Sequence, residues 1–274
     1  GWENGVNITM ETKITDGRIS LKGNVAYRES AKKADYILYL NKYHPIAIVE
    51  AKDNKHSISH GLQQAKEYAE MMDVPFAYSS NGDGFQEYDF LTGAERTLPM
   101  DAFPTVDALV ARYKAERHDG KGLHAEEEKL IAQPFYSSQT TYPPRYYQRN
   151  AVNRTLDAIA RGQDRILLVM ATGTGKTYTA FQIVYRLLSS GVKRKVLYLA
   201  DRNNLVDQSI QQDFAPLEKV IHKVNFAKDR RDTITSYEVY FALYQQLVGD
   251  NDQEHYSELF DPDFFDLIIV DECH

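Results

Sequence analysis

Two short stretches of this chain contain residue types whose spacing suits phosphate chemistry. Residues 170–177 read Met-Ala-Thr-Gly-Thr-Gly-Lys-Thr, and the last four residues, 271–274, read Asp-Glu-Cys-His. Glycines let backbone N–H groups approach phosphate oxygens without a Cβ in the way, and the lysine that follows adds a positive charge. A threonine hydroxyl and an aspartate are oxygen ligands that suit Mg²⁺. Together, the two stretches predict a site for ATP and Mg²⁺.

The residues of this predicted nucleotide site have different roles. Those assigned to the phosphates and Mg²⁺ are Thr172, Gly173, Thr174, Gly175, Lys176, Thr177 and Asp271, with Thr177 and Asp271 as the metal ligands. Glu272 would polarise the water that attacks the γ-phosphate. Gln148 is a candidate reader of adenine, because a glutamine amide can hydrogen-bond an adenine edge twice. Met170 stands where the strict phosphate-loop pattern has glycine. Helicase-type loops share that departure.

The elements that must position these residues can be predicted from apolar patterns. The runs 166–170, 196–200 and 265–270 predict three buried parallel strands. Helical periodicity predicts one helix that opens at 145–149 and ends at Gly162, and another from the lysine of the loop to Gly191. A further helix is expected to start at Asn203 and Asn204. In a doubly wound sheet, the phosphate loop and the acidic residues would meet at the carboxyl ends of the strands.

A second chemistry lies in the first third of the chain. Residues 34–40 and 45–52 read as two strands with a turn at 41–44, which predicts an antiparallel hairpin. Asp35 and Glu50 stand near its outer ends, so the hairpin brings two carboxylates together as a Mg²⁺ site. Lys52, on the same face as Glu50, can orient water or stabilise a pentacovalent phosphate. This Asp…Glu-x-Lys set is typical of restriction-type nucleases.

The helix expected over 57–72 follows directly and adds two candidate residues. Its apolar positions form one stripe, and Gln64 and Tyr68, four residues apart, point the same way from a flanking face. Such a pair can reach the DNA backbone near the metal. Two more strands are expected at 74–78 and 85–90, joined by a glycine-rich turn at 81–84.

The order of these motifs resembles the R subunit of type I restriction enzymes. Glu-Ala-Lys, Gln-x-x-x-Tyr and Ser-Asn-Gly come first, and Tyr-Tyr-Gln, the phosphate loop, Asp-Arg-x-x-Leu and Asp-Glu-Cys-His follow. The resemblance implies a restriction-endonuclease-like mixed sheet with flanking helices, followed by a partial RecA-like parallel-sheet motor of superfamily 2. It implies Mg-dependent cleavage of double-stranded DNA driven by stalled ATP-dependent translocation. The implied partners are modification (methyltransferase) and specificity subunits.

The resemblance also suggests how the chain is organised. A nuclease domain is expected over 1–116, a linker over 117–144 with a short helix near 125–132, and the first motor domain over 145–274. The start at Gly1 suggests the tail of an N-terminal helix. Ending after the acidic box suggests a truncated motor that lacks activity in isolation.

Composition agrees with a cytoplasmic enzyme, and the resemblance implies a prokaryotic one. The single cysteine among 274 residues excludes an internal disulfide and fits a reducing compartment. No apolar run approaches the ~18 residues of a membrane span. A net charge of −7 weighs mildly against a nonspecific DNA binder, and the eight histidines show no metal-ligand spacing.

Two other functional classes remain open. One is a stand-alone helicase–nuclease of DNA repair or antiviral defence, which the same motifs would serve. Co-purification with a methyltransferase and a specificity subunit would separate it from the restriction enzyme. The other is a non-catalytic DNA-binding or assembly module whose nuclease-like hairpin has decayed. The intact set of Asp35, Glu50 and Lys52 weighs against it.

Overall fold

The computed structural model describes residues 1–17, 19–23, 25–247 and 255–272. They form two compact α/β units, Gly1–Arg154 and Thr155–His274, and each is described here by itself. The domain limits expected from the sequence remain predictions. Among the described residues, none of the helices has the length and apolar character needed to cross a membrane.

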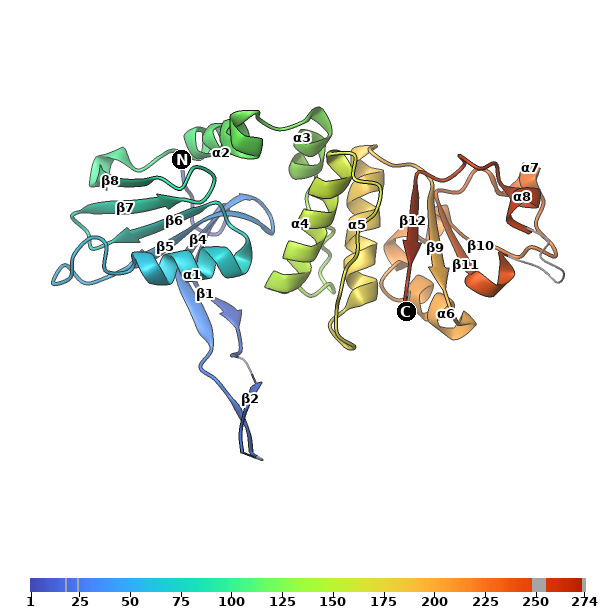
Figure 1. Ribbon diagram of the computed structural model, residues 1–274, viewed down its shortest axis with the longest axis horizontal. Helices are drawn as coiled ribbons and strands as arrows, with labels where there is room; N and C mark the ends of the chain where they lie inside the picture. The colour runs from blue at the N-terminus through green and yellow to red at the C-terminus, as the bar shows by residue number, and fades with distance from the viewer. Residues whose placement is uncertain (18, 24, 248–254, 273–274) are drawn as a thin grey trace. The chain divides into compact units, whose positions relative to one another are not determined.

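A six-stranded mixed sheet forms the centre of the first unit (Figure 1). Its strands, in spatial order, are β1 (Ile8–Thr15), β4 (Lys32–Asn41), β5 (His44–Ala51), β6 (Phe76–Ser80), β7 (Gly84–Asp89) and β8 (Glu95–Pro99). Only the β5–β6 pair is parallel, and the other four pairs are antiparallel. The expected hairpin is confirmed as β4–β5. A separate ribbon of β2 (Ile19–Lys22) and β3 (Val25–Arg28) interrupts the chain between β1 and β4.

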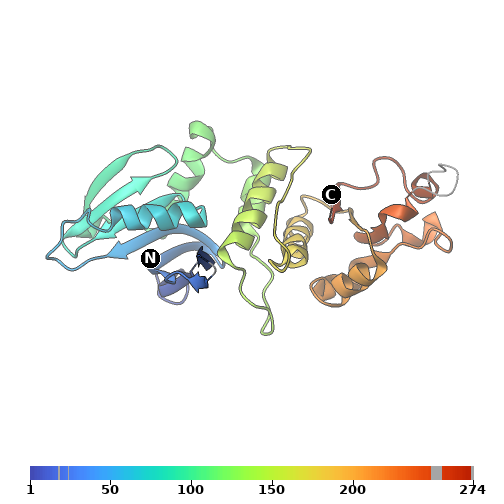
Figure 2. The same ribbon diagram turned by 60° about the horizontal axis from the view of Figure 1, so that its bottom comes forward.

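Helices α1 (Leu62–Met72) and α2 (Val106–Gly120) cover the two faces of this sheet. Ala65 and Ala69 of α1 are buried in one apolar cluster with Ile37 and Ile48 of the strands. Leu109 and Tyr113 of α2 are buried in another cluster with alternate strand positions. Figure 2 shows α1 lying along the sheet. Since successive strand residues point to opposite faces, both faces of β4 and β5 are core.

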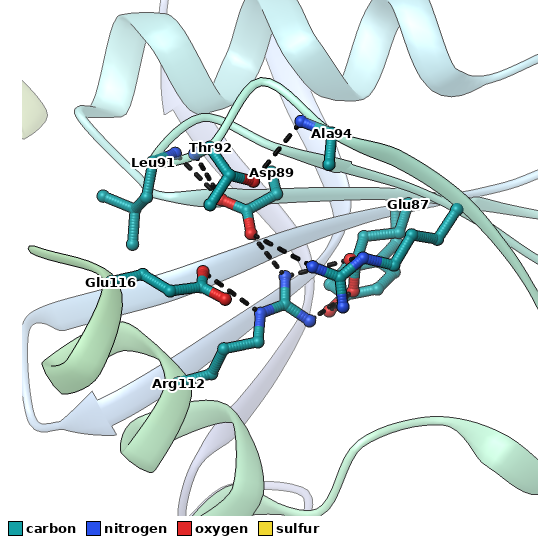
Figure 3. Close-up of polar contacts among 9 residues, drawn as sticks. Glu87, Asp89, Leu91, Thr92, Ala94, Arg112 and Glu116 are labelled. Carbon is teal, nitrogen blue, oxygen red and sulfur yellow. Dashed lines mark hydrogen bonds and ion pairs between the residues drawn. The ribbon is translucent and has the colours of Figure 1, made fainter. Parts of the chain in front are cut away.

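A buried ionic cluster joins α2 to β7 (Figure 3). The Arg112 guanidinium donates to Glu87 at 2.9 and 3.0 Å and to Asp89 Oδ2 at 3.0 Å. Both acids are 0% exposed, so their negative charges need positively charged partners within the protein. The Tyr78 hydroxyl donates to Glu87 Oε2 at 2.6 Å. Burial alone would lower the pKa of Arg112, but the hydrogen bonds and charge of Glu87 raise it.

Two helices follow α2. The helix α3 (Ala125–Ala132) confirms the short helix expected at 125–132, and α4 (Tyr146–Ala160) confirms the one expected before Gly162. The first part of α4 is held to the first unit. There Asn150 Nδ2 donates to the Met71 carbonyl at 2.9 Å.

A four-stranded parallel sheet forms the core of the second unit, in the order β10-β11-β9-β12. Its elements are α5 (Lys176–Ser190), β9 (Val196–Ala200), α6 (Asn203–Gln211), β10 (Ile221–Lys223), α7 (Arg231–Ile234), β11 (Val239–Leu243), α8 (His255–Leu259) and β12 (Leu267–Val270). Phe181 of α5 packs on Phe214, which packs on Tyr198 and Phe241 of the sheet. Leu197 and Tyr240 pack with Phe260 in a separate cluster.

Several local expectations were wrong. Residues 166–170 form no strand, and Leu167 and Val169 are 73% and 89% exposed. A strand needs a hydrogen-bonded neighbour, and among the described residues this run has none. β12 lies at an edge of its sheet with alternate residues exposed, so it is not a buried strand. Residues 1–7 contain no helix and lead into β1.

One helix start and one helix cap also differ from expectation. α1 begins at Leu62, because the residues from Ser57 form turns in which Leu62 N donates to the Ser59 carbonyl at 3.0 Å. α6 begins at Asn203 as expected, but Arg202 is its N-cap residue and no side chain caps it.

Candidate nuclease and nucleotide sites

Two carboxylates meet at the outer end of the β4–β5 hairpin. The pairing of Tyr36 with Val49 sets Asp35 opposite Glu50 at the next position. The Asp35 amide donates to Glu50 Oε1 at 3.3 Å, and the Ala51 amide donates to Asp35 Oδ2 at 2.8 Å. Directly opposed residues of an antiparallel pair share a face of the sheet. The structure therefore brings together the two acids that the sequence singled out.

Lys52, Gln64 and Tyr68 extend this pair into a connected polar chain. Lys52 Nζ lies 3.4 Å from Glu50 Oε2 and donates to Gln64 Oε1 at 3.0 Å. Gln64 Nε2 donates to the Tyr68 hydroxyl at 3.2 Å. The four-residue spacing on α1 aligns these two side chains. Gln64 thus holds the lysine amine beside the acids, and Tyr68 holds Gln64.

One contact that positions α1 beside this site was not predicted from the sequence. The Gly61 amide, just before α1, donates to Ser79 Oγ at 3.0 Å, and Ser79 pairs with Glu50 in the β5–β6 ladder. A Cβ on Gly61 would lie 2.8 Å from Ser79 Oγ, 3.0 Å from Lys52 Cε and 3.2 Å from Glu50 Cβ. Only glycine fits without displacing a neighbour. The sequence signal was a glycine directly before an apolar helical stripe.

The electrostatics of the acid pair favour a cation. Burial, together with the negative charge of Asp35, raises the pKa of Glu50 from its usual 4.5 to about 7. Two facing carboxylates repel one another, and a divalent cation between them would relieve that repulsion. Carboxylate oxygens are the hard ligands that Mg²⁺ prefers. Asp35 and Glu50 therefore fit a magnesium ion.

The phosphate-type loop turns sharply before α5. Gly173 and Gly175 have φ angles of +77° and +83°, in the left-handed region that glycine tolerates best. Thr174 Oγ1 donates to the Ala171 carbonyl at 2.6 Å, which closes the turn. Because α5 begins at Lys176, the N–H groups of its first turn add to an anion-binding end.

The acidic residues after β12 meet this loop. Lys176 Nζ lies 3.1 Å from Glu272 Oε1. Asp271 Oδ2 accepts a hydrogen bond from the Tyr198 hydroxyl at 2.9 Å, and burial with the Asp271 charge raises the pKa of Tyr198. The Asp271 amide donates to the Leu199 carbonyl at 2.9 Å, so β9 fixes the start of the acidic pair. Cys273 and His274 lie outside the described residues.

The side chain of Gln148 already has a hydrogen-bond partner. Its Oε1 accepts a hydrogen bond from the Arg145 amide at 2.9 Å, beside the first turn of α4, and the residue is 8% exposed. To bind adenine, the amide oxygen would have to use its second lone pair or leave that partner. Gln148 belongs to the first unit and the other nucleotide residues to the second, so its assignment stays a prediction.

Two family models match most of the chain. Residues 7–104 match the N terminus of the type I restriction enzyme R protein, and residues 141–274 match the res subunit of type III restriction enzymes. The chain is 43% identical over its full length to the EcoAI type I restriction enzyme endonuclease subunit of Escherichia coli, and covers 33% of that protein. It is 28% identical to the EcoKI endonuclease subunit of E. coli K12, with 88% of this chain and 24% of that protein covered.

A solved structure agrees with these matches. It is described as a fragment of an HsdR subunit of a type I restriction enzyme from Vibrio vulnificus YJ016, and it superimposes with a TM-score of 0.78 at 37% identity. All of this chain and 48% of that chain are covered. The chain spans a third or less of the curated relatives described above. On the motif order, the matched models and the structural likeness, the chain belongs to the R-subunit family of type I restriction enzymes.

Proposed function

We propose that this chain carries the DNA-cleaving site and part of the ATP-dependent translocation motor of a type I restriction–modification enzyme. The observation that supports this most directly is the convergence of Asp35, Glu50 and Lys52, with Lys52 Nζ 3.0 Å from Gln64 Oε1. The first unit would have a restriction-endonuclease-like fold and the second a RecA-like fold.

In the nuclease site, Asp35 and Glu50 would hold Mg²⁺, which would supply positive charge and a more acidic bound water. The Lys52 amine would donate to the scissile phosphate or orient the attacking water. Its two neighbours support that role, because Gln64 Oε1 and Glu50 Oε2 both accept from Nζ and limit its movement. Tyr68 would act as a positioning residue through Gln64.

In the motor site, the loop Thr172–Thr177 would bind the phosphates of ATP, and Thr177 with Asp271 would hold the accompanying Mg²⁺. Lys176 would leave Glu272, its present partner, for the β- and γ-phosphates. Glu272 would then be available to accept a proton from the attacking water. Gln148 would read adenine.

The partners in this proposal are double-stranded DNA and the modification and specificity subunits, in the cytoplasm of a prokaryote. Cleavage would follow when translocation stalls. These parts come from the family, whose curated relatives are described as type I restriction enzyme endonuclease subunits.

Plasmid cleavage by the assembled complex, containing the complete R subunit, tests the proposal. Glu50→Ala should abolish cleavage and leave ATP hydrolysis intact, whereas Lys176→Ala should abolish both hydrolysis and cleavage. Cleavage by the Glu50→Ala complex would refute the nuclease assignment. ATP-dependent cleavage by the R subunit without its partners would favour the stand-alone helicase–nuclease.

A further inference from the structure

Three potential metal ligands converge where α2 gives way to α3. Ligand atoms of His118, His124 and Glu127 all lie within 4.8 Å of one another, the only such group of three or more found in the part of the chain that the structure describes. The group belongs to the first unit and shares no residue with the candidate nuclease site. The pattern His-x5-His-x2-Glu crosses a turn, so it has no regular helical or strand spacing that would have shown it in the sequence.

The carboxylate at the centre of this group is buried and oriented. Glu127 is 2% exposed, and its Oε1 lies 2.6 Å from His118 Nε2. Its Oε2 accepts a hydrogen bond from the His124 amide at 2.7 Å. The Arg117 guanidinium lies 4.0 Å from Glu127 Oε1. The histidine rings approach to 5.6 Å between centroids. One carboxylate oxygen is therefore fixed by the backbone while the other faces an imidazole nitrogen.

The backbone at His118 adopts a conformation that is unusual for a residue with a side chain. His118 and Asp119 have φ angles of 55° and 57°, in the left-handed region, and they interrupt the helical path near the end of α2. Such conformations are disfavoured for residues with a Cβ and persist where the surrounding contacts hold them. Here the turn points the His118 ring back onto α3.

We propose that His118, His124 and Glu127 bind a divalent transition-metal ion of the Zn²⁺ type. Imidazole nitrogens select such ions over Mg²⁺. Tetrahedral Zn²⁺ bonds of about 2.0–2.1 Å place neighbouring ligand atoms about 3.3 Å apart. The separations of 2.6 Å and up to 4.8 Å lie on either side of that value, so side-chain rotations suffice. Glu127 Oε2 would keep its backbone donor, an arrangement that commonly orients ligating carboxylates.

The bound ion would tie the end of α2 to the start of α3. It would take the place of the proton between His118 and Glu127, and water would complete its coordination. The competing account is a turn held by the His118–Glu127 hydrogen bond and the Glu127 cap alone. That account predicts no metal affinity.

Equilibrium dialysis of this chain against Zn²⁺, in excess Mg²⁺ to occupy carboxylate-only sites, separates the two accounts. We expect one Zn²⁺ per chain, lost in both His118→Gln and His124→Gln. The matched control is His222→Gln, since His222 pairs with Asp229 at 2.8 Å in the second unit; it should keep the ion.

Two further readouts address folding of the variants. Zn²⁺ should raise the melting temperature of the wild type and the control, but not that of His118→Gln or His124→Gln. Co²⁺ should give the wild type a visible absorption band that both variants lack. Failure of the wild type to retain stoichiometric Zn²⁺ would overturn the proposal without reference to any variant. So would undiminished binding in both histidine variants.

Discussion

At the scale of single residues, Glu50 links folding to metal binding. It is completely buried beside Asp35, which makes its ionised form costly unless a cation is near. A protein that needed only stability would have little use for such a residue at the end of a core strand. The buried carboxylate is understandable if it has to bind Mg²⁺, because the charge of the ion stabilises the ionised form that burial disfavours.

This linkage predicts a pH-dependent stability difference between the wild type and Glu50→Gln. The folded-state pKa of about 7 lies above the ordinary 4.5, so the ionised form destabilises the fold increasingly from pH 4.5 to 7 and fully above 7. Glutamine mimics the neutral acid. The two proteins should unfold alike at about pH 4.5, and the variant should be more stable at about pH 8.5, by at most about 3 kcal/mol.

Thermal melts without Mg²⁺, followed by fluorescence of the sole tryptophan, Trp2, would measure this difference. Trp2 reports on the first unit, where its Nε1 donates to the Pro104 carbonyl at 2.8 Å. Adding Mg²⁺ at high pH should stabilise the wild type and leave the variant unchanged. Parallel stability curves at all pH values would show that Glu50 is not a buried ionising acid.

Glu272 gives a second residue-scale prediction. Its contact with Lys176 at 3.1 Å competes with phosphate for the amine. In the complete subunit, Glu272→Gln should lower ATP hydrolysis at least about 10²-fold, as loss of a general base does, while nucleotide affinity is kept or increased. Glu218→Gln, an exposed site in the same unit, is the control. Hydrolysis at the wild-type rate would remove Glu272 from the mechanism.

At the scale of elements, the start of α1 sets the geometry of the nuclease site. Gly61→Ala adds a Cβ that would lie 2.8 Å from Ser79 Oγ and 3.0 Å from Lys52 Cε, so α1 or Lys52 must move. A displacement of this size should reduce DNA cleavage by the assembled complex at least about 10-fold while ATP hydrolysis persists. Gln63→Ala, exposed on the same first turn, should cleave normally. Equal activity of both variants would mean that the site tolerates movement of α1.

The α2–β7 cluster gives a prediction of stability. Arg112→Met leaves the buried Glu87 and Asp89 with only the longer contacts of Arg96, at 3.7 and 3.9 Å, which should cost up to about 3–5 kcal/mol. Arg154→Met removes an exposed pair with Asp73 and should cost less than about 1 kcal/mol. Urea unfolding followed by Trp2 fluorescence would compare them. Glu87→Gln added to Arg112→Met should recover part of the loss, and its failure to do so would place the cost outside these charges.

The helices and strands that could be predicted are those whose sequence signal lies within a single segment of the chain. The β4–β5 hairpin and α3 were predictable, because a turn signal and helical periodicity lie within each segment. Residues 166–170 have the apolar composition of a strand but no strand beside them, and composition carries no information about a partner. The roles of Ser79 and Glu127 were not predicted, because their contacts depend on the parallel β5–β6 pairing and on the left-handed turn at His118.

At the scale of the whole molecule, each unit has its own sheet and its own apolar clusters. Independent cores predict independent unfolding. Phe214→Ala, at a 0% exposed position that packs on Tyr198 and Phe241, should cost the second unit about 3–5 kcal/mol. It should shift the part of the helical circular dichroism that comes from the second unit to lower urea without moving the Trp2 transition. Arg112→Met should move the Trp2 transition together with the part of the circular dichroism that comes from α1, α2 and α3 of the first unit. A shift of the Trp2 transition in Phe214→Ala would show that the units fold as one, and the nuclease and motor assignments would then need tests that control for shared stability.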